Sequence, residues 1–145
     1  MKSLGELGLQ RVPLSLGSIQ QLAALPLNKL ILYNCDITDG DLASLANCKT
    51  LRELHLSGNP QITSTGLKLL AQLPIQHLNI EKVNISDPEL KVFSDWKNLR
   101  TLDVSNCPGV TKAGADRLKA SIHHDLSVLP FDEPMIKGIN FGSPF

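Results

Sequence analysis

Apolar residues recur along this chain in a short pattern whose first, fourth and sixth positions are apolar. Five copies lie at residues 4–9, 27–32, 51–56, 75–80 and 99–104. The copies begin 23, 24, 24 and 24 residues apart. Alternation within each copy predicts a short strand with one buried face. A period near 24 residues predicts a solenoid of repeated units.

A second pattern predicts a helix after each strand. Hydroxyl residues follow the apolar residue that closes each loop, where a helix N-cap is favoured: Thr38, Thr63, Ser86 and Thr111. Behind them run three columns of mostly apolar residues: Ile19, Leu42, Leu67, Leu90 and Ala115; Leu22, Leu45, Leu70, Phe93 and Leu118; Leu25, Cys48, Leu73, Trp96 and Ser121. We expect these columns to form the helical layer of the core, stabilised by stacking between neighbouring repeats.

The strand motif and the residues after it resemble the leucine-rich repeat, whose consensus is L-x-x-L-x-L-x-x-N/C-x-L. Cys35, Asn59 and Cys107 occupy its N/C position. Val12 and Val83 depart from it, because valine cannot bind the neighbouring loop's backbone groups as asparagine does. The repeats are most similar to the short intracellular type, which includes cysteine-containing and bacterial-effector repeats. The resemblance implies an α/β solenoid of five repeats, with a concave parallel sheet and convex helices.

Leucine is abundant up to Leu129 and absent after it. This change predicts a repeat domain over residues 1–129 and a non-repeat tail over 130–145. One period after Leu102 and Val104 come Leu126 and Val128, which predicts a degenerate capping strand. In the tail we expect four apolar side chains to pack: Phe131, Met135, Ile136 and Phe141.

The composition narrows the classes of partner and the cellular compartment. Lys and Arg number 14, as do Asp and Glu, and this zero net charge argues against nucleic acid. No segment is apolar enough to predict a membrane span. Cys35, Cys48 and Cys107 each have a structural position, which favours reduced, inert thiols. We therefore expect a cytoplasmic protein, or one in the host cytosol if it is a secreted bacterial effector, with no cofactor and no metal.

The polar positions between the leucines have no core to fill, and they form lateral rows because parallel strands lie about 4.8 Å apart. One row reads Gly8, Ile31, His55, Asn79 and Asp103. Solenoids bind partners through this concave face. The predicted footprint of a partner protein is Ile31, Tyr33, Arg52, His55, His77 and Asn79. The function predicted from it is protein recognition without catalysis, as an adaptor or a bacterial effector.

Three other interpretations remain open at this stage. The face can be a solvated surface without a partner. The chain can instead be an assembly subunit that docks through its N-terminal end, where no cap is visible, or through its C-terminal tail. That end would be covered by a second copy in a homodimer or by a missing N-terminal segment. The third interpretation is a hydrolase-like or metal site around His55 and His77, for which the sequence lacks a supporting motif.

Overall fold

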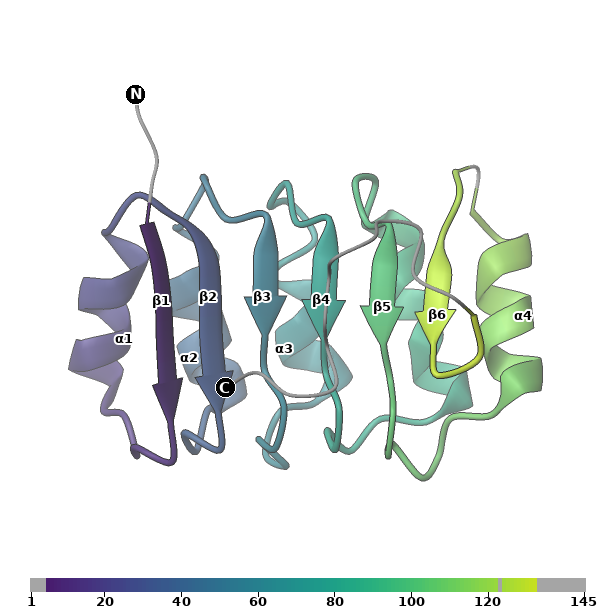
Figure 1. Cartoon of the computed structure of the whole chain (residues 1–145), viewed down its shortest axis with the longest axis horizontal. Coiled ribbons are helices and arrows are strands. Elements are labelled where there is room, and N and C mark those ends of the chain that lie inside the picture. The colour runs from purple at the N-terminus through teal and green to yellow at the C-terminus, as the bar shows by residue number, and fades with distance from the viewer. Residues whose placement is uncertain (1–4, 123, 133–145) are drawn as a thin grey trace.

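The computed structural model describes residues 5–122 and 124–132, which form one parallel sheet backed by helices (Figure 1). The strands are β1 (Gly5–Gln10), β2 (Leu27–Tyr33), β3 (Glu53–His55), β4 (His77–Asn79), β5 (Thr101–Asp103) and β6 (Ser127–Leu129). The helices are α1 (Leu16–Ala23), α2 (Asp39–Leu45), α3 (Ser64–Lys68), the 3-10 helix η1 (Asp87–Asp95) and α4 (Lys112–Ala120). The predicted α/β solenoid is confirmed.

The strands follow one another across the sheet in chain order, from β1 to β6. Leu30 pairs with Leu54, Leu54 with Leu78, and Leu78 with Leu102. All helices lie on one side of the sheet in Figure 1, and no described helix or strand covers the other side. We call that other side the helix-free face; it is the face predicted to be concave.

The core lies between the sheet and the helices. The inward leucines of β2 to β5 are buried, and most residues of the three helical columns are buried with them. Three column residues depart from the prediction. Leu22 is only partly buried, Leu25 is 45% exposed, and Ser121 is exposed. Two of these lie in the first repeat and the third in the last, at the two ends of the described stack.

The fourth repeat has a 3-10 helix, η1, where the sequence predicted an ordinary helix. Side chains three residues apart align on one face of a 3-10 helix. Leu90, Phe93 and Trp96 have this spacing and are all buried. The rings of Phe93 and Trp96 meet edge to face with centroids 5.3 Å apart. This geometry directs the two bulkiest core residues toward the sheet.

The predicted hydroxyl caps are present at three of the four helices. Thr38 forms a capping box with Asp41, while Thr63 and Thr111 accept backbone N–H groups in the first turns of α3 and α4. Ser86 precedes η1 but makes no such cap. Its hydroxyl instead donates to Glu89 Oε1 at 2.8 Å.

The sheet ends at β6, two residues later than the period predicts. Leu102 pairs with Val128 rather than with Leu126. The fifth repeat spans 26 residues from Leu102 to its partner Val128, so extrapolating the 24-residue period misplaces the register. Phe131 packs partly buried against the core. Met135, Ile136 and Phe141 lie outside the described residues, and the boundary between domain and tail stays a prediction.

Candidate functional site

The helix-free face carries the six residues of the predicted footprint. The register places Ile31 beside His55 and His55 beside Asn79. Lys29, Glu53 and His77 form the next row, and each pairs with its neighbour. Tyr33 ends β2, and Arg52 immediately precedes β3. The rows predicted from the period are therefore confirmed.

Accessibility divides the six residues into two groups. Arg52 is exposed, and Ile31 and Tyr33 are half-buried. The other three side chains are buried, which differs from the expectation of positions with no core to fill: His55, His77 and Asn79 expose 1, 6 and 0% of their surface. A buried polar group is tolerated where it is hydrogen-bonded, and all three have such partners.

His55 belongs to a small charged group on β2 and β3. Its Nε2 atom lies 2.8 Å from Glu53 Oε1, and Lys29 Nζ lies 3.7 Å from the same oxygen. Burial of Glu53 acts to raise its pKa. The hydrogen bond with His55 and the charge of Lys29 outweigh burial, so the pKa of this carboxyl lies below its usual value. Glu53 is therefore a charged anchor for the imidazole of His55.

His77 is bound to the next strand. Its Nδ1 atom lies 2.6 Å from Thr101 Oγ1. Burial lowers the pKa of His77, and the charges of Arg100 and His55 act in the same direction against the opposing effect of Glu53. His77 is therefore held in its neutral form to lower pH than an ordinary histidine.

Asn79 is the centre of a second cluster of hydrogen bonds. Its Oδ1 atom accepts the hydroxyl of Ser57 and the backbone N–H of Glu81, both at 2.8 Å. On the following strand, Asp103 Oδ1 accepts the backbone N–H of Ser105 at 2.8 Å. Burial raises the pKa of Asp103 despite this bond. Hydrogen bonds within the sheet thus hold the side chains of the polar rows in fixed positions.

The arrangement supports hydrogen-bonded recognition better than acid–base chemistry. Within residues 5–122 and 124–132, no three His, Cys, Asp or Glu side chains converge in a manner that would hold a metal ion. The ring atoms His55 Nε2 and His77 Nδ1 already face Glu53 and Thr101. A catalytic zinc site, by contrast, has three convergent protein ligands and one open coordination position on the metal.

Sequence reasoning left four residues out of the footprint that the structure connects to it. Three of them contact footprint members directly: Glu53 contacts His55, Ser57 contacts Asn79 and Thr101 contacts His77. The fourth, Lys29, faces Glu53. The row pattern contained the signal, since all four alternate with the buried leucines. Arg100 is also exposed, and it occupies in the fifth repeat the position that Arg52 occupies in the third. It borders a polar hollow lined with Lys97 and His124.

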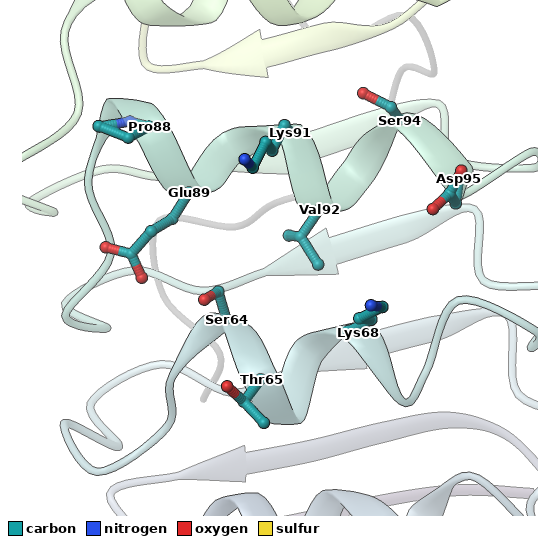
Figure 2. A pocket seen from close by; sticks show the side chains of 9 residues that line it. All are labelled: Ser64, Thr65, Lys68, Pro88, Glu89, Lys91, Val92, Ser94 and Asp95. Atoms are coloured by element: carbon teal, nitrogen blue, oxygen red, sulfur yellow. The ribbon is translucent and has the colours of Figure 1, made fainter.

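A groove on the opposite, helical side offers a comparison. Figure 2 shows this groove between α3 and η1, with Val92 and the stem of Lys68 facing its centre. Its volume is about 690 Å³. Lys68 and Lys91 are balanced by Glu89 and Asp95 along its walls. Because the positive and negative side chains are equal in number, the groove favours neither an anionic nor a cationic ligand.

Comparison with known proteins identifies two of the repeats and the fold. The family model described as Leucine Rich repeat matches residues 47–71 and 97–119. The fold superposes on a chain from the crystal structure of the Rad7 and Elc1 complex in yeast, with a TM-score of 0.64 and 20% sequence identity. The chain contains leucine-rich repeats. The superposition covers 79% of this chain and 30% of the yeast chain.

The two matched leucine-rich repeats contain β3 with Asn59 and β5 with Cys107, which fit the family consensus. The repeat with Val83 lies between the two matched segments. A search of curated proteins finds no significant match. No helix in the described ranges of the chain is long and apolar enough to cross a membrane. Leucine-rich repeats are interaction folds that offer an extended surface for binding.

Proposed function

We propose that the protein is an interaction module that binds a partner protein through its helix-free face. The observation that carries this proposal is that Ile31 and Tyr33 lie on β2 beside the fixed polar rows, while the exposed Arg52 lies at the start of β3, at the opposite end of the strand pair from Tyr33. Tyrosine and arginine are the residue types that most often dominate binding energy at protein interfaces. Ile31, two residues before Tyr33, adds apolar area.

The chemistry of this surface suggests what it binds. A partner would place an apolar side chain against Ile31 and Tyr33 and a carboxylate against Arg52, since guanidinium groups favour bidentate pairing with carboxylates. The buried His55, His77 and Asn79 would contribute by holding this face of the sheet rigid. Zero net charge supports a protein partner over nucleic acid. The yeast relative was crystallised in a complex, which is consistent with a binding role.

We further propose a cytoplasmic adaptor role. Cys35, Cys48 and Cys107 are all free and buried, as suits a reducing compartment. Action as a bacterial effector inside a host would meet the same redox conditions. The proposal assigns no catalytic residue and no cofactor.

Affinity purification with single substitutions tests the binding face. Proteins captured from the source cells by the unaltered chain are identified, and the dissociation constant of each purified candidate is measured. Tyr33→Ala or Arg52→Ala should weaken binding by about 1 kcal/mol or more, roughly fivefold, with little change in Tm. The matched controls Lys68→Ala and Lys91→Ala alter the helical side. Binding lost in these controls but retained in the first pair would refute the proposal.

A further inference from the structure

The first repeat buries its apolar residues less completely than the second repeat does. Four of its inward side chains are only partly buried: Leu7, Leu9, Leu14 and Leu22. Their equivalents in the second repeat are fully buried: Leu30, Leu32, Ile37 and Leu45. Three of the four exposed large apolar residues among the described residues also belong to the first repeat: Val12, Leu16 and Leu25. Such a concentration of apolar surface marks an interaction site.

Within the described sheet, the backbone of β1 pairs with β2 on one side only. Gly5 donates its N–H to Pro26 at 3.3 Å, and Arg11 donates its N–H to Tyr33 at 2.8 Å. The odd-numbered residues therefore direct their backbone groups toward β2. Because direction alternates along a strand, Glu6, Gly8 and Gln10 direct their N–H and C=O groups away from β2. In the described sheet β1 is an edge strand, and these groups form a template for another strand.

We propose that β1 pairs antiparallel with β1 of a second copy of this chain, about a two-fold axis at Gly8. In this register Gly8 lies opposite Gly8 of the second copy, and Glu6 lies opposite Gln10. Directly opposed residues of this kind exchange two backbone hydrogen bonds. Every outward backbone group from Glu6 to Gln10 then has a partner. The two sheets become one continuous sheet.

The side chains select this register over its neighbours. A slip by one residue would place the apolar side of one strand against the polar side of the other. A slip by two residues would leave one of the three hydrogen-bonding residues unpaired at each end. In the proposed register Leu7 lies opposite Leu9 of the second copy, on the core side. Each copy thereby covers the other's incompletely buried leucines.

The strand is also complementary to itself in its polar side chains. Glu6 and Gln10 project to the helix-free face, and in the proposed pair each lies opposite the other. The Gln10 amide can donate to the Glu6 carboxylate twice in each dimer. The backbone and side-chain match to an identical strand is the reason to favour a second copy over an unrelated segment. This inference does not depend on the proposed function.

A charge substitution at Gln10 tests the pairing in solution without touching the β1–β2 ladder. Sedimentation or light scattering on the full chain over a concentration series gives the dissociation constant of the dimer. Because Gln10 lies opposite Glu6 at both ends of the paired strands, Gln10→Glu places a second carboxylate opposite each Glu6. Gln10→Lys instead places a positive charge opposite each Glu6. The logarithm of the dissociation constant changes in proportion to the energy of the cross-strand pairs, and two such pairs form in each dimer. We therefore expect Gln10→Glu to weaken and Gln10→Lys to tighten the dimer by about 2- to 30-fold.

Gly8 provides a second, backbone test. Gly8→Pro removes an outward N–H at an edge position, where proline leaves the bonds to β2 in place, so the chain should become monomeric. Gly8→Ala keeps the N–H and should remain dimeric. Circular dichroism and Tm confirm that both variants are folded. A monomeric unaltered chain at every concentration, a dimer that survives Gly8→Pro, or equal effects of the two Gln10 variants would overturn the proposal.

Discussion

Asn59 Oδ1 accepts the backbone N–H of Cys35 at 2.9 Å, although the two residues lie one full repeat apart. The same oxygen accepts the N–H of Ile37 at 3.1 Å. The Asn59 amide donates to three carbonyls, those of Leu32, Leu56 and Ser57. One buried side chain thus satisfies the loops of two successive repeats.

Asn59→Ala should destabilise the protein by about 2–5 kcal/mol, because the buried N–H groups of Cys35 and Ile37 would lose their acceptor. Urea unfolding followed by circular dichroism measures the change. Asn84→Ala is the control, since Asn84 is exposed and its loss should stay within about 0.5 kcal/mol. Equal losses in the two variants would contradict the proposed role of Asn59.

Two glycines should respond in opposite directions to the same substitution. A Cβ at Gly66 would collide with the carboxylate of Asp39, which binds the N–H and hydroxyl of Thr63. A Cβ at Gly40 would meet only Thr38 Oγ1, at 3.7 Å. We expect Gly40→Ala to stabilise α2 by about 0.5–1 kcal/mol and Gly66→Ala to lower the free energy of unfolding. Thermal unfolding of both variants checks the sign of each effect.

The bond between Asp87 and Thr111 should contribute a pH-dependent part of the stability. The Asp87 carboxylate accepts the Thr111 hydroxyl and, at 2.7 Å, its backbone N–H. These bonds, the hydroxyl first, hold the pKa of Asp87 below its ordinary value of 3.8. A lowered pKa in the folded state gives stability that is complete above the unfolded pKa and disappears as pH falls through the folded one.

Asp87→Asn should therefore cost stability at pH 6 and progressively less below about pH 4. Tm measured for the variant and the unaltered chain from pH 6 to pH 2 gives the difference at each pH. A difference for Asp87→Asn that stays constant down to pH 2 would rule out the linkage.

The three thiols should react slowly in the folded protein. Burial raises the pKa of Cys35 and raises that of Cys107 to about 11. Only a very small fraction of Cys107 is thiolate at pH 8, and the thiolate is the reactive form. Cys48 is buried as well. Labelling with a thiol reagent should become fast only in denaturant, and rapid native labelling of all three thiols would contradict their core positions.

The sequence predicted those features that repeat with the period. The pairing of Leu30 with Leu54 and the row through Ile31, His55 and Asn79 follow from spacing alone. The burial of His55 does not, because it depends on contacts with other parts of the structure. The late register of β6 reflects the two additional residues of the fifth repeat, which a strict period ignores.

The 3-10 conformation of η1 was missed for a related reason. Three-residue spacing of apolar residues also occurs in repeats with an α-helix, as at Leu42 and Leu45 in α2. The spacing alone therefore does not separate the two helix types. The size of Phe93 and Trp96, which must both reach the core, favours the slimmer helix in this repeat.

Because each repeat contributes one strand to the sheet, equivalent residues of successive repeats lie at a fixed spacing. Each repeat advances the sheet by one strand, about 4.8 Å. Arg52 and Arg100 occupy the same position two repeats apart, so their backbones are separated by about 10 Å regardless of the side chains between them. Adding or deleting one whole repeat between the two arginines would change this distance by one strand spacing. The spacing of charges that the protein presents is thus set by counting repeats rather than by adjusting side chains.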